Sequence, residues 1–199
     1  MSPCRPRAAA SALSRRRSVA LALLLAPLAH GAAAQERPAE PVGKVEAAFL
    51  RNFARYVTWP PQAFADERAA WVVCVLGGEH FDDSLERTFL GRTEQGRPFK
   101  VIRVAPPDPL PACQIAFIAY ETAARRRSVL NELRKRPVLT VGNAPEFLQE
   151  GGVIRLLARE QVEMSVNLDQ ARAVSLAIPT KMLEVSREIV EGGVARKWR

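Results

Sequence analysis

The closest approach to a catalytic cluster in this sequence lies at positions 79–83. Glu79, Asp82 and Asp83 surround His80, and acidic side chains around one histidine can carry acid/base chemistry in a pocket. The same acids are also favoured in the first turn of a helix, where they meet the positive end of its dipole. No G-x-S-x-G motif and no penicillin-binding Ser-x-x-Lys motif accompanies them. We therefore expect no catalytic residue and no enzyme. A hydrolase built from carboxylates alone is the catalytic alternative, since paired acids need only be close in space.

Two glycines stand directly before this cluster and end an apolar segment at 71–76. In an open α/β sheet, ligands usually bind in the crevice beyond the carboxyl ends of the strands. Gly77, Gly78 and the later Asn143 are therefore a candidate ligand crevice. The glycine pair lacks the G-x-G-x-x-G spacing and a P-loop lysine, so a tight loop is the simpler interpretation.

Cysteine is the other residue type that could do chemistry. Cys4 belongs to an N-terminal leader, which leaves Cys74 and Cys113. In an oxidising compartment two lone cysteines favour a disulfide, and each lies in or beside an apolar segment predicted to be a strand. Two unpaired thiols are the alternative. Only His80 stands outside the leader as a histidine, and the sequence has no Cys-x-x-Cys, so we predict neither a metal site nor a cofactor.

The leader, residues 1–34, has the pattern of a cleaved secretory signal peptide. Three arginines at 15–17 precede an apolar stretch at 19–29, and the alanines at 32–34 offer a small-residue cleavage site. The apolar stretch contains Pro27 and is shorter than the roughly 20 residues that span a bilayer. We therefore predict an exported chain without a membrane span, and an uncleaved anchor is the alternative.

Removal of the leader changes the charge of the protein. Residues 1–34 hold five arginines and no acid, so the formal net charge falls from +8 to +3, with 24 basic and 21 acidic groups left. The remaining basic residues cluster at 125–127 and 134–136 with no aromatic residue between them. Proteins that bind single-stranded nucleic acid combine basic grooves with stacking aromatics. We expect a solvated helix face and no nucleic-acid partner; an acidic partner or an anionic surface is the alternative.

The rest of the chain alternates between helical and extended hydrophobic periods, which predicts an α/β fold. We expect a single-domain three-layer sandwich, with a five- or six-stranded, mostly parallel sheet flanked by helices and a C-terminal antiparallel hairpin joined at 158–161. Helices are predicted at 44–57, 81–90, 122–135, 144–150, 169–175 and 180–191, and strands at 71–76, 99–104, 114–119, 137–141, 152–157 and 161–168. The domain is expected to span 44–191, after a disordered lead-in at 35–43 and before a frayed tail at 192–199.

The first predicted helix carries an aromatic stripe. Phe49, Phe53 and Tyr56 recur at helical spacing, and the stripe could simply cover the sheet. Trp59 precedes two prolines, where the helix must end, and could anchor either the turn or a partner chain.

Several sequence blocks in fixed order resemble the YfiR-like family of periplasmic regulators. The likeness begins with the run from Lys44 to Pro60 and extends over nearly the whole chain after the leader. The blocks that carry it are KVEAAFLRNFARYVTWP, VCVLG at 73–77, LGRT at 90–93 with GRP at 96–98, the segment 113–119, RPVLTV at 136–141, GGVI at 151–154, VNL at 166–168 and KML at 181–183.

This resemblance implies a function. Members of the YfiR-like family are periplasmic α/β domains that tend to dimerise. They bind the periplasmic sensor region of a membrane-bound diguanylate cyclase and inhibit it, and this inhibition lowers cyclic di-GMP signalling and biofilm formation. An outer-membrane lipoprotein of the peptidoglycan-binding type can capture the regulator. Cys74 and Cys113 match the family's paired cysteines, whereas a second pair found in some members is missing.

The partner surface is predicted to use Phe49, Phe53, Tyr56 and Trp59, with the helix at 180–190 as the second candidate. A periplasmic small-molecule binding module that feeds a sensor protein is the alternative function. That alternative predicts a concave pocket with converging polar groups, whereas the regulator predicts an exposed apolar patch and a self-complementary dimer face.

Overall fold

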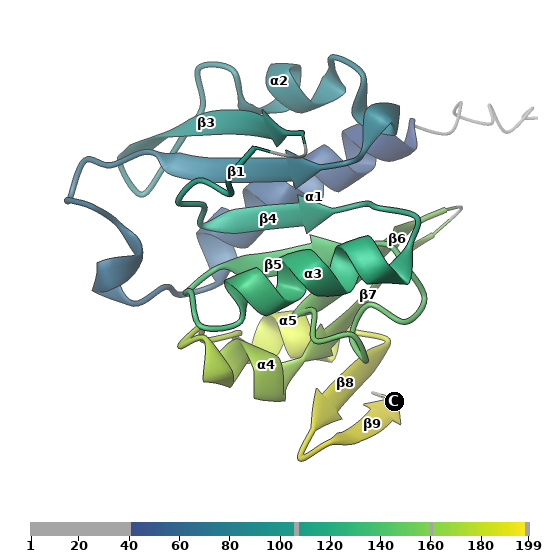
Figure 1. Ribbon diagram of the computed structural model, residues 1–199. Coiled ribbons are helices and arrows are strands. Elements are labelled where there is room, and N and C mark those ends of the chain that lie inside the picture. Colours follow the sequence, from purple (N-terminus) through teal and green to yellow (C-terminus); the bar gives the residue numbers. More distant parts are fainter. Residues whose placement is uncertain (1–40, 106–107, 160, 198–199) are drawn as a thin grey trace, which may run out of the picture. The chain divides into compact units, whose positions relative to one another are not determined.

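Strands with both parallel and antiparallel partners build one sheet, with helices on its two faces (Figure 1). The computed structural model describes residues 41–105, 108–159 and 161–197. Within these residues nine strands follow the order β2-β3-β1-β4-β5-β6-β7-β8-β9. The strands are β1 Trp71–Leu76, β2 Thr93–Glu94, β3 Arg97–Val104, β4 Ile115–Ile118, β5 Leu139–Gly142, β6 Ile154–Ala158, β7 Val162–Asn167, β8 Glu188–Glu191 and β9 Val194–Lys197. The helices are α1 Val42–Tyr56, α2 Ser84–Phe89, α3 Ala123–Leu133, α4 Leu168–Ala173 and α5 Thr180–Glu184, with short 3-10 turns η1 Pro61–Ala63 and η2 Glu79–Phe81.

The centre of the sheet is parallel. β1 pairs with β3 on one side and β4 on the other, and β4 continues through β5 to β6. Five of the six residues of β1 are buried, as expected for a strand that is covered on both faces. The carboxyl ends of β1, β3 and β4 therefore meet at one edge of the sheet.

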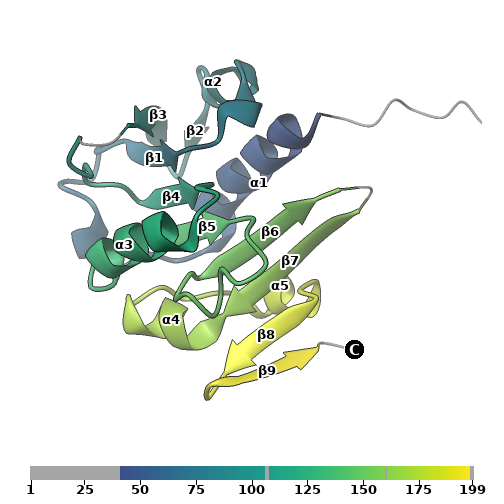
Figure 2. The same ribbon diagram turned by 45° about the vertical axis from the view of Figure 1, so that its right-hand side comes forward.

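Alternate side chains of these strands enter two apolar layers. Val73, Val75 and Phe117 belong to one layer with residues of α1 and α2, whereas Leu76 and Ile118 belong to another with residues of α3. Figures 1 and 2 show α1 and α3 on opposite sides of the central strands. The predicted α/β architecture is confirmed.

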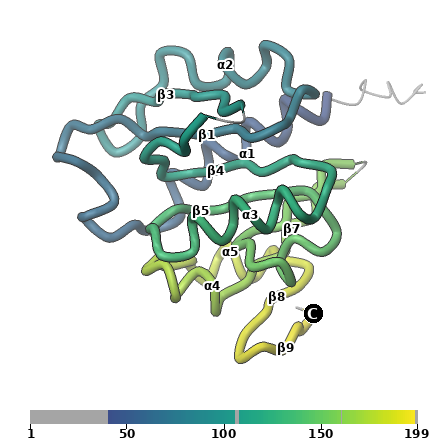
Figure 3. The backbone as a smooth tube through the Cα atoms, viewed as in Figure 1, coloured from purple at the N-terminus to yellow at the C-terminus, as the bar shows by residue number. Residues whose placement is uncertain are grey.

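The predicted hairpin is also confirmed. β6 and β7 are antiparallel, with Ile154 opposite Val166 and Ala158 opposite Val162. β8 then adds to β7 in parallel and β9 closes a further antiparallel pair at the C-terminal end of the chain (Figure 3).

The predicted size of the sheet is wrong, because it has nine strands rather than five or six among the described residues. β2 has two residues, too few for a hydrophobic period to show. β8 lies within the segment 180–191, which was predicted as one helix: α5 ends at Glu184, and Ile189 of β8 is buried against the sheet. β9 lies within 192–199, predicted as a frayed tail, although all four of its residues are exposed.

The helix predicted at 144–150 is a series of turns instead. Phe147 is completely buried. A Cβ atom added to Gly142 would lie 2.5 Å from the nearest atom of the Phe147 ring, and one added to Gly152 would lie 2.1 Å from it. The two glycines accept the ring between them, and the chain folds around it. The predicted signal peptide at 1–34 and residues 35–40 of the lead-in lie outside the described residues, while Val42 and Gly43 already belong to α1.

Candidate partner-binding site

Two of the four aromatic residues predicted to bind a partner are part of the core. Phe53 is 2% exposed and Trp59 is 8% exposed. The indole Nε1 of Trp59 donates a hydrogen bond to the Gln114 carbonyl oxygen at 3.1 Å, and its ring meets Trp71 edge to face at 4.9 Å. A buried indole with its N–H satisfied is well suited to hold a turn in place. Trp59 thus anchors the segment that follows α1.

The other two aromatic residues reach the surface. Tyr56 is half exposed, and Phe49 is partly buried, packing against the core with its ring 6.2 Å from that of Phe53. The difference follows from helical spacing, because the face of α1 that contains Ala47, Leu50 and Ala54 is turned toward the sheet and is completely buried.

Tyr56 and the partly buried Phe49 border a groove of about 280 Å³ between α1 and α5. Met164 of β7 lies on the lining, and Met182 and Val185 come from α5 and the residue after it. The residues that line the groove are Phe49, Asn52, Phe53, Tyr56, Met164, Lys181, Met182 and Val185. The structure therefore brings together the two segments that were predicted separately as partner surfaces, although they lie far apart in the sequence.

The groove is apolar apart from Asn52 and Lys181. Val185 is 73% exposed and Tyr56 is 50% exposed, so two large apolar side chains at its border are left to solvent. Flexible methionines and exposed aromatic rings are common at surfaces that bind apolar side chains of a partner. This arrangement can receive an apolar side chain of a partner.

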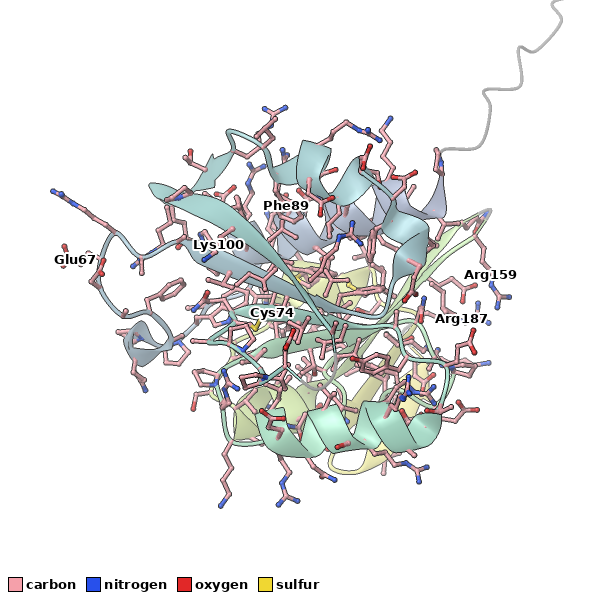
Figure 4. All side chains as sticks on the ribbon, turned by 45° about the horizontal axis from the view of Figure 1, so that its top comes forward. Glu67, Cys74, Phe89, Lys100, Arg159 and Arg187 are labelled. Carbon is pink, nitrogen blue, oxygen red and sulfur yellow. A yellow bond between two sulfur atoms is a disulfide. The ribbon has the colours of Figure 1, made fainter. Side chains whose placement is uncertain are left out.

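The predicted pair of cysteines forms a disulfide. Cys74 of β1 and Cys113, two residues before β4, have Cα atoms 6.0 Å apart. Figure 4 labels Cys74 among the strands of the sheet. The bond lies in the apolar layer that contains Leu130 and Leu133 of α3, whereas the groove lies on the α1 side. The disulfide supports the sheet and does not line the groove.

The predicted ligand crevice is brought together only in part. Gly77 lines a cavity of about 590 Å³ at the carboxyl ends of β1, β3 and β4, together with Arg103, Tyr120 and Arg125. Neither Gly78 nor Asn143 is among the residues described as lining this cavity. Gly77 and Gly78 have positive φ angles of 74° and 81°. A tight turn requires such angles, and glycine adopts them without strain. A ligand at this edge stays a prediction.

His80 pairs with an acid that lies outside the cluster at 79–83. The Nε2 atom of His80 lies 2.6 Å from the Oε2 atom of Glu46 on α1, and the side chain of Glu46 is 1% exposed. Asp82 instead accepts a hydrogen bond from the Ser84 backbone N–H at 2.7 Å. The hydrogen bond to the Glu46 carboxylate raises the pKa of His80 above its ordinary value, since it favours the charged imidazolium. The pair therefore links η2 to α1.

One arginine of the basic cluster at 125–127 has a structural partner that the sequence did not indicate. Arg126 is buried, and its guanidinium forms two hydrogen bonds of 2.7 Å to the carboxylate of Glu150. It also donates to the Tyr120 and Glu121 carbonyl oxygens. The pair fastens the start of α3 to the loop before β6. A buried glutamate 24 residues away carries no local signal, so only the fold reveals it.

Within 41–105, 108–159 and 161–197, no group of three or more histidine, cysteine, aspartate or glutamate side chains could hold a metal ion. Over the same ranges no helix combines the length and the apolar character that crossing a membrane would need.

Comparison with known proteins gives one match. A sequence model described as YfiR/HmsC-like matches residues 43–187, which runs from the second residue of α1 to the residue before β8. No curated protein matches the chain.

Proposed function

Because the chain belongs to the YfiR/HmsC-like family, we propose that it binds the periplasmic sensor region of a membrane-bound diguanylate cyclase and holds the cyclase inactive. Membership suggests a periplasmic regulator of cyclic di-GMP signalling. Inhibition of the cyclase would lower cyclic di-GMP in the cytoplasm and reduce biofilm formation. The regulator would act without touching the nucleotide.

The observation that carries this proposal is the apolar groove between α1 and α5. Its exposed border residues, Tyr56 and Val185, lose contact with water when a partner side chain enters. Burial of apolar surface contributes roughly 25 cal/mol per Å², and a few well-packed anchors usually dominate the affinity of an interface. Asn52 and Lys181 at the border can satisfy polar groups of the partner.

The mechanism is a shift between two conformations of the cyclase sensor. A regulator that binds the inactive conformation more tightly moves the equilibrium toward it, by no more than the difference between its two affinities. A shift from mostly active to mostly inactive, 1:99 to 99:1, needs a difference of about 10⁴-fold. No catalytic step is required of the regulator.

Release of the cyclase would follow from competition for the same surface. We propose that an outer-membrane lipoprotein of the peptidoglycan-binding type captures the regulator through the α1–α5 groove, so the two partners exclude one another. A homodimer is part of the same proposal, as the family resemblance implies.

The second candidate function is a periplasmic small-molecule binding module that feeds a sensor protein. The cavity of about 590 Å³ beside Gly77 favours it, because the carboxyl edge of a parallel sheet is where α/β domains usually bind ligands. Both functions could reside in one protein, since the cavity and the groove are lined by different residues.

A pull-down from an envelope extract of the host tests the proposal. The bait is the protein purified from the cell envelope of the host. It is used in the natural form and as the variants Val185→Asp and Val194→Asp. Both positions are exposed valines, at 73% and 54%, but only Val185 lines the groove. We expect the natural protein and Val194→Asp to retain a diguanylate cyclase with a periplasmic segment, and Val185→Asp to lose it.

The extract must be shown to contain such a cyclase. If Val185→Asp retained the cyclase as well as the natural protein does, the partner surface would lie outside the groove. Retention of neither a cyclase nor an outer-membrane lipoprotein by the natural protein would contradict the proposal and favour the small-molecule module.

A further inference from the structure

A second groove lies on the other side of α1, between α1 and α2, and has the opposite chemistry. It has a volume of about 500 Å³. Among the residues that the structure describes, the charged side chains lining it are all basic: Lys44 and Arg51 from α1, Arg87 from α2 and Arg92 from the turn after α2. Asn52 lines this groove as well as the apolar one.

The sequence of α1 explains the groove. Lys44, Ala48 and Arg51 are spaced by four and three residues, so they lie on one face of the helix. Ala48 is exposed, and its methyl group is too short to fill the space between the long basic side chains on either side. Ala48 therefore forms the floor of the groove, and α2, which packs beside α1, forms the wall opposite α1.

The charges of the three arginines in this groove, Arg51, Arg87 and Arg92, are poorly compensated within the described residues. Arg87 approaches Asp82 and Asp83 at 3.8 Å and 3.5 Å, but all three side chains are at least 66% exposed, and such pairs contribute little. No ion pair is described for Arg92, or for the half-buried Arg51, among residues 41–105, 108–159 and 161–197. One turn further along α1, by contrast, Arg55 pairs with Glu94 at 3.0 Å.

We propose that the groove between α1 and α2 is a binding site for a polyvalent, phosphate-bearing anion. Arginine presents a planar fork of N–H donors that matches phosphate oxygens two at a time, and three arginines converge here from two helices and a turn. Asn52 of α1 also lines the groove, and its side-chain amide adds N–H donors. This inference does not depend on the proposed regulation of a cyclase.

The lining also limits the class of ligand. None of the described residues that line the groove is aromatic, so a nucleobase would lack the stacking partner that proteins usually provide. Ala48 is the one apolar residue among its described lining, so a protein segment would find no large apolar side chain to pack against. A phosphate group is what the residues can recognise, either in a free ion of the pyrophosphate kind or in a phospholipid headgroup.

Two binding measurements distinguish these sources. The first is calorimetric titration of the protein, purified from the envelope, with pyrophosphate at low and high salt. The second is co-sedimentation with phosphatidylglycerol vesicles, with phosphatidylcholine vesicles as the zwitterionic comparison. Poly-glutamate serves as the probe for an acidic protein segment.

The variants form matched pairs. Ala48→Glu and Ala48→Gln place side chains of equal size on the groove floor and differ only in charge, and both residues suit an exposed helical position. Arg92→Gln removes a charge from the groove, whereas Arg196→Gln removes one from the exposed β9. Urea unfolding of each variant verifies that it folds.

We expect pyrophosphate or phosphatidylglycerol binding that weakens with salt and falls at least about tenfold in Ala48→Glu and in Arg92→Gln, as loss of charge-assisted contacts predicts. Ala48→Gln should bind more tightly than Ala48→Glu, and Arg196→Gln should match the natural protein. Binding of vesicles alone, with the same variant pattern, assigns the phosphate to a lipid headgroup. Binding that the groove variants leave unchanged, binding of poly-glutamate alone, or no binding to any probe would overturn the inference.

Discussion

The two faces of the central sheet use their side chains differently. On the α3 side, a charged residue and a cysteine are satisfied inside the molecule: Arg126 pairs with Glu150, and Cys74 is bonded to Cys113. On the α1 face, Tyr56 and Val185 stay exposed beside an apolar groove. The buried groups on the α3 side stabilise the fold, whereas the groove on the α1 side is where we propose recognition. Variants of those buried groups should therefore change stability, and variants in the groove should change binding.

The largest effect is expected from the buried ion pair. Arg126→Ala leaves the carboxylate of Glu150, 1% exposed, without its main partner, and loss of one member of a buried pair typically costs about 3–5 kcal/mol. Urea unfolding measures the change. Arg127→Ala is the control, because Arg127 is 63% exposed and 4.0 Å from Glu150. Equal losses in both variants would contradict a stabilising role for Arg126.

Removal of the disulfide should have the next largest effect. Cys74 and Cys113 are separated by 39 positions, and closure of a loop of this length restricts the unfolded chain by roughly 3–4 kcal/mol on the loop-entropy model. Unfolding of the double variant Cys74→Ala and Cys113→Ala, compared with the natural protein, gives the value. At urea concentrations below its unfolding transition, the double variant should still bind the partner. Loss of binding by a folded variant would show that the two faces are coupled.

A smaller effect with a defined pH dependence is expected from His80. The hydrogen bond to Glu46 raises the pKa of His80 in the folded protein, so its contribution is fully present below the unfolded pKa of about 6.5 and is lost as pH rises through the folded value. Because the side chain is 35% exposed, the contribution should be at most about 1 kcal/mol after solvent screening.

Urea unfolding across this pH range, for the natural protein and for Glu46→Gln, measures that contribution. The glutamine keeps the size of the side chain and removes its charge, so the decline with rising pH should largely disappear. A decline of equal size in both proteins would assign the pH dependence to other groups.

The smallest effect on stability is expected in the groove. Tyr56→Ala changes a half-exposed side chain, and such surface substitutions usually alter the free energy of unfolding by no more than about 0.5 kcal/mol. Its effect on partner affinity should nevertheless reach about tenfold, as for an aromatic anchor. A stability loss comparable to that of Arg126→Ala would show that Tyr56 serves the fold and would remove the distinction between the faces.

Local sequence patterns predicted what depends on neighbouring residues. The apolar segments that became β1, β3, β4 and β5, the β6–β7 hairpin and the disulfide all followed from periodicity, spacing and cysteine count. Ile189 and Val190 were assigned to a helix because an apolar pair suits either structure, and pairing of β8 with β7 decided between them.

The surfaces depend on contacts between distant segments. The aromatic stripe on α1 was predicted correctly as a helix face, but its period could not separate the core side chain of Phe53 from the exposed Tyr56. Trp59, which follows the helix, also lies in the core. The meeting of α1 with α5, and of Arg126 with Glu150, has no local signal. The basic groove depends on α2 packing beside Ala48, which the sequence of α1 alone does not reveal.

The most direct test of the central claim is photo-crosslinking in living cells of the host, with a photoreactive phenylalanine analogue placed at Tyr56 or at Val194. Tyr56 lines the apolar groove, whereas Val194 is an exposed residue of β9. Our account predicts that position 56 crosslinks to the periplasmic segment of a membrane-bound diguanylate cyclase and that position 194 does not. A cyclase crosslink from position 194 alone, or none from position 56 in cells shown to contain the cyclase, would contradict it.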